Sequence, residues 1–355
     1  MVDINDAAAL KAVDSTGMHC ALTGLSTQCS AAYEIGQKAP LTETEDVRTI
    51  LVAGLGGSAI GGDLLRVYCQ ERLGIPVLVN RDYGLPAFAG SSTLVFAVSY
   101  SGNTEETLSA YRLARERGCA VIVLTSGGKL QAMGTADGVP VIQIPPGLAP
   151  RAATGYLFLP MLAVLERLRV LSGVGQEVTE LVQLLDTYAN VYGLETPTDR
   201  NPAKQLALNL KDKMPVIWGA SGTTEVAALR WKGQINENAK APAYWNSFPE
   251  LNHNEIVGFG QPVELLQKLW LIMLKDKGDH PRVEYRMEVT KRVVADKVAG
   301  VTEVISAGDG LLARLYSLIY MGDWTSFYLA LLYGIDPGPV RVIDYLKEEL
   351  AKRPV

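Results

Sequence analysis

The sequence has few of the residues on which metal and disulfide chemistry depend. Its 355 residues include only four cysteines and three histidines, and no two cysteines form a CxxC pair. These spacings match no zinc-binding pattern, so we expect no metal site. Scattered cysteines of this kind are typical of reduced thiols in a cytoplasmic protein.

Excess basic charge and long uncharged apolar runs are also absent. The net charge is -5 at pH 7, which argues against a nucleic-acid partner because phosphate backbones attract basic surfaces. The longest apolar stretch, residues 311–332, contains Arg314 and Asp323, so we expect a buried helix rather than a membrane span. The first residues contain neither a basic nor an apolar leader segment, so we expect no secretion signal.

Short apolar segments alternate with amphipathic segments in both halves of the chain. We expect strands at residues 49–53, 76–80, 93–99, 120–125, 141–144, 215–218, 269–274 and 300–306. We expect helices at residues 7–13, 59–70, 104–117, 224–239, 282–297, 311–333 and 340–352, with a long helical region at 152–192. Strands that are apolar throughout and alternate with helices indicate a parallel sheet covered on both faces. The predicted fold class is therefore α/β, with two doubly wound parallel sheets.

The length of the chain and its proline-rich and polar segments indicate how it divides into domains. A chain of 355 residues is long enough for two domains, and proline-rich or polar segments at 145–150 and 193–202 mark breaks. We expect an N-terminal helical extension (1–34), a first domain (35–155), a helical linker (156–200), a second domain (201–335) and a C-terminal helix (336–355).

A glycine-rich loop, residues 54–62, follows the first expected strand and leads into a helix. Glycines let the backbone approach an anion, and the helix start supplies free N–H groups, so Gly57 and Ser58 are predicted phosphate-binding residues. A rival interpretation is a dinucleotide site of an NAD-dependent oxidoreductase, because Asp82 lies near the position of a ribose-binding acid. The position of Asp82 is equally typical of a residue in a simple turn.

A second loop favours phosphate over dinucleotide. The segment Ser99-Tyr-Ser-Gly-Asn-Thr104 contains three hydroxyl residues and a glycine where a strand gives way to a helix. Hydroxyls and backbone amides at such a position form a small phosphate cradle, so Ser99, Ser101 and Thr104 are predicted to bind phosphate and sugar oxygens. We also expect the Thr104 hydroxyl to cap the following helix.

These loops, taken with the doubled α/β plan, resemble the sugar isomerase (SIS) domain. Later segments narrow the resemblance to the bifunctional phosphoglucose/phosphomannose isomerases, from about residue 35 to the C-terminus. The matching segments are Pro150-Arg-Ala-Ala-x-Gly-Tyr156, Gln234-Ile-Asn-Glu-Asn-Ala-Lys240, Leu251-Asn-His-Asn-Glu255 and Asp279-His-Pro-Arg282.

The resemblance implies an aldose–ketose isomerase that needs no metal or cofactor. It would interconvert glucose 6-phosphate and mannose 6-phosphate with fructose 6-phosphate through a cis-enediol(ate). It implies that Glu237 is the catalytic base and that His253 opens the sugar ring from the neighbouring subunit of a homodimer. Arg151 would stabilise the enediolate, and Lys347 would be the C-terminal catalytic lysine.

One alternative is a protein with the same fold but no catalytic activity. A non-catalytic sugar-phosphate-binding SIS protein would be expected to have lost Glu237 and His253, and both are present. One feature departs from expectation, because neither Gly338 nor Val340 supplies a hydroxyl close to Lys347. The contribution of the C-terminal segment therefore stays open.

Overall fold

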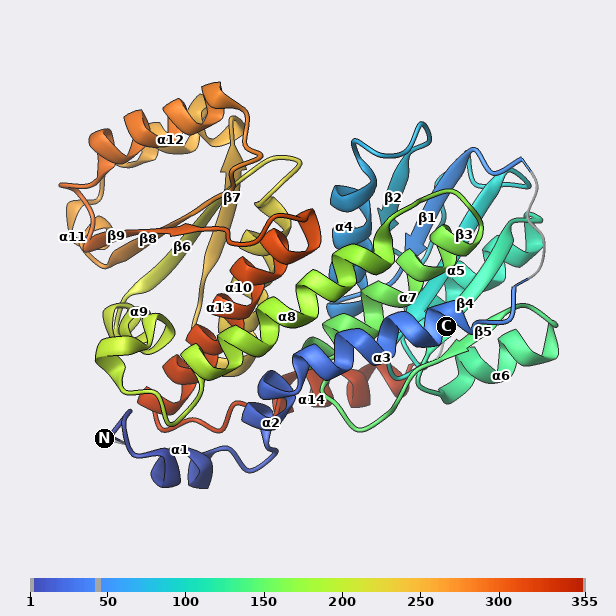
Figure 1. Cartoon of the computed structure of the whole chain (residues 1–355), viewed down its shortest axis with the longest axis horizontal. Coiled ribbons are helices and arrows are strands. Elements are labelled where there is room, and N and C mark those ends of the chain that lie inside the picture. Colours follow the sequence, from blue (N-terminus) through green and yellow to red (C-terminus); the bar gives the residue numbers. More distant parts are fainter. Residues whose placement is uncertain (1–2, 42–45, 354–355) are drawn as a thin grey trace.

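The computed structural model describes residues 3–41 and 46–353. Its strands form two separate parallel sheets, here called sheet A and sheet B, with long helices lying between them (Figure 1). Each sheet has helices of its own packed against it. This arrangement confirms the predicted pair of doubly wound α/β layers.

Sheet A has the strand order β2-β1-β3-β4-β5. Its strands are β1 (Thr49–Ala53), β2 (Val77–Asn80), β3 (Thr93–Ser99), β4 (Ala120–Thr125) and β5 (Val141–Gln143). Its helices are α4 (Gly57–Cys69), α5 (Glu105–Glu116) and α6 (Gly128–Ala136). Strands β1 and β3 are neighbours, with Ala53 opposite Ala97, so the loops that follow them lie at the same edge of the sheet.

Sheet B repeats the order of the first four strands of sheet A, as β7-β6-β8-β9. Its strands are β6 (Met214–Ala220), β7 (Tyr244–Phe248), β8 (Leu269–Lys275) and β9 (Gly300–Ile305). Its helices are α10 (Glu225–Ala239), α11 (Val263–Leu266) and α12 (Pro281–Val294). The repeated order supports the predicted use of one architecture twice, although sheet B ends without a fifth strand.

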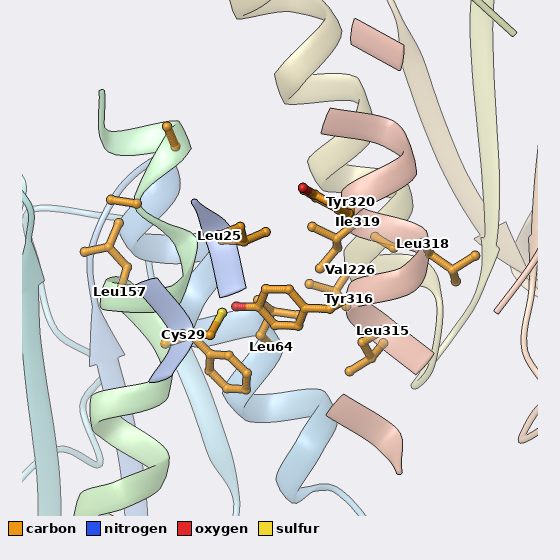
Figure 2. Close-up of a cluster of buried hydrophobic side chains, with 14 of the residues drawn as sticks. Leu25, Cys29, Leu64, Leu157, Val226, Leu315, Tyr316, Leu318, Ile319 and Tyr320 are labelled. Atoms are coloured by element: carbon orange, nitrogen blue, oxygen red, sulfur yellow. The ribbon is translucent and has the colours of Figure 1, made fainter. Parts of the chain in front are cut away.

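A central layer of helices joins the two halves. It contains α3 (Leu25–Gln37), α7 (Thr154–Arg167), α8 (Val174–Tyr192), α9 (Pro202–Leu210) and α13 (Leu311–Leu332). Figure 2 shows how Cys29 of α3, Leu64 of α4 and Val226 of α10 meet around Tyr316 of α13. One apolar cluster therefore spans both halves. No helix within residues 3–41 and 46–353 is long and apolar enough to cross a bilayer.

Three short helical or terminal segments complete the chain. They are α1 (Ala7–Val13), α2 (Met18–Thr23) and α14 (Arg341–Ala351). The predicted ranges of α1, β1, β3 and β4 agree with the structure to the residue. Helices α6, α9 and α11 and strand β7 were not predicted, because they are short or are interrupted by glycines, prolines or polar residues. Helices α2 and α3 were expected only as part of the helical N-terminal extension, without bounds of their own.

Candidate active site

The glycine-rich loop between β1 and α4 packs closely against a turn from a later part of the chain, residues 150–152. Gly56 has a left-handed φ of 54° and precedes the first residue of α4. A Cβ on Gly57 would lie 2.6 Å from the carbonyl oxygen of Pro150, in the short helix η1 (Pro150–Ala152). Glycine at position 57 therefore lets the start of α4 approach the turn that carries Arg151.

The second loop holds its own shape through its hydroxyl groups. Ser99 is buried, and its Oγ lies 2.9 Å from Thr104 Oγ1 and accepts a hydrogen bond from Gly102 N at 3.1 Å. Thr104 stands at the N-cap position of α5, but its hydroxyl makes no capping bond, so that expectation was wrong. Ser101 is the exposed hydroxyl of the loop and is available to a ligand.

The two loops lie at the carboxyl ends of neighbouring strands of one parallel sheet, which is where ligands bind in open α/β sheets. Asp82, the residue on which the dinucleotide interpretation depends, is exposed and accepts a hydrogen bond from Tyr83 N at 2.7 Å. Asp82 therefore stabilises a turn, since the N–H of the residue that follows it binds its carboxylate.

A cavity of about 160 Å³ brings the first loop together with residues from the second half of the chain. Its lining residues are Gly56, Gly57, Ile60, Arg81, Arg151, Leu229, Arg230, Lys232, Gly233, Gln234 and Glu237. The predicted residues Gly57, Arg151 and Glu237 therefore share one cavity, although they are far apart in the sequence. Arg81 and Lys232 were not predicted, and they add positive charge to its wall.

Arg151 is the buried centre of this cavity wall. Its Nε donates to Asn238 Oδ1 at 2.7 Å, and its Nη1 lies 3.4 Å from Glu237 Oε2. The Arg151 side chain is 4% exposed, whereas that of Glu237 is 33% exposed. The pair thus leaves the carboxylate open to a ligand while the guanidinium is fixed from behind. Burial lowers the pKa of Arg151, and the charge of Glu237 opposes that change.

A buried ion pair supports the site from below. Arg230 Nη2 lies 2.7 Å from Asp323 Oδ2 and also donates to the carbonyl oxygen of Arg151 at 2.9 Å. Gln234 Nε2 donates to Asp323 Oδ1 at 2.8 Å. The sequence carried a signal for this network, because an aspartate inside an otherwise apolar helix must find a partner when it is buried. It did not reveal that the partner was Arg230.

Lys240 is a further cation beside the predicted base. It ends α10 in a left-handed conformation, and its Nζ donates to the carbonyl oxygens of Glu237 at 2.6 Å and Pro337 at 3.0 Å. Burial lowers the pKa of Lys240, and the charge of Arg151 lowers it further. Arg151 and Lys240 therefore place two positive charges beside Glu237, and positive charge in such a position suits a developing enediolate.

His253 lies at the opposite end of sheet B from Glu237. It closes the short helix η3 (Glu250–His253), which follows the carboxyl end of β7. Glu237 lies near the end of α10, which starts at that same edge and runs back along β6. At 1.5 Å per residue α10 is about 22 Å long. The structure therefore does not bring His253 and Glu237 of one chain together.

Lys347 is exposed, and none of the described residues of α14 is buried. No hydrogen bond or ion pair between described residues joins Lys347 to Glu237 or Arg151. The turn that leads into α14 does reach the site, because Pro337 and Gly338 accept hydrogen bonds from Arg151 Nη2. Within residues 3–41 and 46–353, no three His, Cys, Asp or Glu side chains are grouped to hold a metal ion.

Comparisons with known proteins cover both halves of the chain. Residues 45–164 match the SIS domain model, and residues 199–350 match the bacterial phospho-glucose isomerase C-terminal SIS domain model. A bifunctional phosphoglucose/phosphomannose isomerase from Caldicellulosiruptor bescii is 50% identical over 92% of this chain and 97% of its own. The enzyme of the same description from Aquifex aeolicus is 38% identical over 85% of this chain and 90% of its own.

Solved structures show the same fold. A glucose-6-phosphate isomerase like protein from Thermus thermophilus superposes with a TM-score of 0.67 over 96% of this chain and 99% of its own. Its sequence identity of 21% limits this likeness to the fold. The predicted class of two SIS-type domains is thereby confirmed.

Proposed function

The chain belongs to the bifunctional phosphoglucose/phosphomannose isomerase family, and we propose that the cavity holding Gly57, Arg151 and Glu237 is its active site. The protein is an aldose–ketose isomerase that interconverts glucose 6-phosphate and mannose 6-phosphate with fructose 6-phosphate. The observation that carries the assignment of the site is the convergence of a phosphate-type loop, a guanidinium and a carboxylate in one cavity.

In the proposed reaction Glu237 moves a proton between C1 and C2 of the open-chain sugar. As the proton leaves carbon, negative charge develops on the enediolate oxygens, and Arg151 stabilises that charge with a donor that is already oriented. Asn238 and the carbonyls of Pro337 and Gly338 occupy the other guanidinium hydrogens. Nη1 donates one hydrogen to Glu237, and its other hydrogen is left for the substrate.

The phosphate group is proposed to bind across the two loops of sheet A. The backbone amide of Gly57 and the exposed Ser101 hydroxyl would contact its oxygens. Buried Ser58, whose N–H donates to Leu55 O at 3.1 Å, would hold the first loop in shape, and Ser99 and Thr104 the second. Because the phosphate is remote from C1 and C2, its binding orients the two reacting carbons without taking part in the proton transfer.

Ring opening is proposed to use His253 from the partner subunit of a homodimer. Two features support this: His253 and Glu237 lie at opposite ends of one domain, and Val257, four residues after His253, is exposed. Mixing Glu237→Gln and His253→Ala subunits tests it. With shared sites, random mixed dimers regain about a quarter of wild-type activity; sites confined to one chain would give no recovery.

Lys347 is proposed to complete the site through α14, since the preceding turn already contacts Arg151. We also keep the division into domains at residues 35–155 and 201–335, because these ranges contain all nine strands of the described chain. A cytoplasmic location is proposed because all four cysteines are free thiols, three of them buried.

The decisive test is to treat the purified protein with EDTA, add fructose 6-phosphate, and quantify glucose 6-phosphate and mannose 6-phosphate in separate coupled assays. Formation of both products supports the proposed metal-independent reaction, and their ratio gives the preference. If neither product forms while fructose 6-phosphate still raises the melting temperature, the protein binds sugar phosphate without isomerising it.

A further inference from the structure

The N-terminal helices lie outside both regions matched by the family models, which begin at residues 45 and 199. They are nevertheless part of the core. Leu22, Leu25 and Cys29 are buried, and Tyr320 OH donates to the carbonyl oxygen of Leu22 at 2.9 Å. Figure 2 shows Leu25 and Cys29 facing Tyr316 and Tyr320. This segment is therefore held firmly against α13.

A buried aspartate fixes the turn between α1 and α2. The Asp14 carboxylate accepts hydrogen bonds from Met18 N and His19 N, both at 2.8 Å, and lies 2.7 Å from His19 Nδ1. Its side chain is fully buried. These bonds fix the direction in which the next two residues, Ser15 and Thr16, leave the turn.

Ser15 and Thr16 contact the turn that leads into α14. Ser15 Oγ donates to Asp336 Oδ2, and Asp336 Oδ1 accepts from Gly338 N at 2.9 Å. Gly338 has no side chain, and Thr16 occupies the space beside it: a Cβ at position 338 would overlap both Oγ1 and Cγ2 of Thr16. Thr16 therefore supplies, from the other end of the chain, a hydroxyl side chain next to Gly338.

The same turn holds the guanidinium of Arg151. Arg151 Nη2 donates to Pro337 O at 2.6 Å and to Gly338 O at 2.7 Å. Any shift of residues 336–338 would move these two acceptors and rotate Nη1 relative to Glu237. Lys240 would lose its bond to Pro337 O through the same shift.

Gln28 of α3 supports Arg151 from its backbone side. Its Nε2 donates to Ala152 O at 3.0 Å, and its Oε1 accepts from Gly155 N at 2.8 Å. Gln28 is buried. The N-terminal segment thus contacts both the backbone that carries Arg151 and the carbonyls that orient its side chain.

We propose that Ser15, Thr16 and Gln28 are positioning residues for Arg151 in the isomerase reaction, an inference that rests on the proposed function. None of the three lines the cavity of the proposed active site. They fix the turn at 336–338 and the η1 backbone, so that Nη1 of Arg151 meets the developing enediolate at the correct angle. The N-terminal extension is then a working part of the site.

A size-exchange cycle between Thr16 and Gly338 tests the inference. The φ of Gly338 is not left-handed, and the three atoms nearest to an alanine Cβ there all belong to the Thr16 side chain. Gly338→Ala should lower kcat by about 10- to 100-fold with little change in KM, since small misplacements of a catalytic group carry costs of that order. Thr16→Gly combined with Gly338→Ala should restore kcat to within about threefold of Thr16→Gly alone.

Ser15→Ala provides a second readout that does not depend on overpacking. It should weaken binding of a hydroxamate analogue of the enediolate more than it raises KM for fructose 6-phosphate, and Ser15→Thr, which keeps the hydroxyl, should recover that binding. The matched control is Asn5→Ala. Asn5 ties the same segment to Thr198 with two bonds of 2.9 Å, away from Arg151.

The outcomes separate this inference from the proposed function. If the wild type is active but Ser15→Ala resembles Asn5→Ala, with a lower melting temperature and unchanged kcat and analogue affinity, the segment only stabilises the fold. Failure of the double variant to recover kcat would contradict the Thr16–Gly338 contact as the route. A wild type that forms no product would overturn both proposals.

Discussion

The carboxyl edges of the two sheets have the same topology and opposite chemistry. In sheet A the loops after β1 and β3 contain glycines and hydroxyls, with no acidic residue in 54–62 or 99–104. In sheet B the loops after β6 and β8 are closed by Asp279. Its carboxylate accepts from Thr223 Oγ1 at 2.5 Å and from Asp276 N at 2.8 Å. In sheet B a carboxylate of the chain itself therefore binds the donors of the loops that correspond to the phosphate loops of sheet A.

This difference explains how one architecture serves two roles. Burial raises the pKa of Asp279, while the hydrogen bonds from Thr223 and Asp276 oppose that rise. A carboxylate in this loop repels a phosphate dianion and consumes the donors that would bind it. In the proposed site, sheet A binds the phosphate and the second domain contributes Glu237 from its opposite edge.

The largest effect is expected from Glu237→Gln. Because the amide cannot accept the proton from carbon, kcat should fall by about 10²- to 10⁴-fold, while KM for fructose 6-phosphate stays within about threefold. The control is Glu225→Gln at the other end of α10, where Glu225 pairs with Arg66 at 2.6 Å. Steady-state kinetics of both variants measure this. A loss of turnover in Glu225→Gln but not in Glu237→Gln would contradict the assignment of the base to Glu237.

A smaller effect should come from the hydroxyls of the two carboxyl edges. Ser101→Ala should raise KM by about tenfold, since a hydrogen bond to a charged group is worth about 1.5–3 kcal/mol. Thr223→Ala makes the same kind of change on sheet B, where the hydroxyl is bound to Asp279. It should lower the melting temperature and leave KM unchanged. A rise in KM for Thr223→Ala would show that sheet B also binds phosphate.

Much of this comparison could be predicted from the sequence, because it depends on local patterns. Strands β1 and β3 of sheet A are buried on both faces, so their apolar runs are continuous, and the glycine and hydroxyl loops follow them directly. Strand β7 was missed because it is an edge strand with exposed Tyr244 and Trp245 and polar residues at its centre. Helix α6 was missed because it begins at a glycine pair and contains Gly134.

The support of the site could not be predicted in the same way. Two partners of Arg151 are the backbone carbonyls of Pro337 and Gly338, and a carbonyl has no signature in a sequence. Thr16 and Gly338 are 322 positions apart in the numbering, and only the packed structure shows that one fills the space beside the other. Local patterns locate the groups that act, whereas tertiary contacts decide how they are held.

The smallest effect is expected at the outer edge of sheet B, where no fifth strand covers β9. Glu303 of β9 lies 2.6 Å from Lys291 Nζ and 3.3 Å from Lys275 Nζ. The bond from Lys291 is the main cause that lowers the pKa of Glu303, and Lys275 adds to it. The lowered pKa means that Glu303 stabilises the fold above its unfolded-state pKa and loses this contribution as pH falls through the folded-state value.

Glu303→Gln should therefore destabilise the protein by less than about 1 kcal/mol near pH 7, because the group is partly exposed and screened by solvent. The difference from wild type should vanish as the pH falls below the folded-state pKa. Thermal melts across pH 3–7, repeated in high salt, measure this, with kcat as the control. A deficit that persists at pH 3 would indicate lost packing rather than charge. A fall in kcat would show that the outer edge of sheet B affects turnover at the site. An unchanged kcat is expected if the second domain acts in the reaction only through the amino edge that carries Glu237.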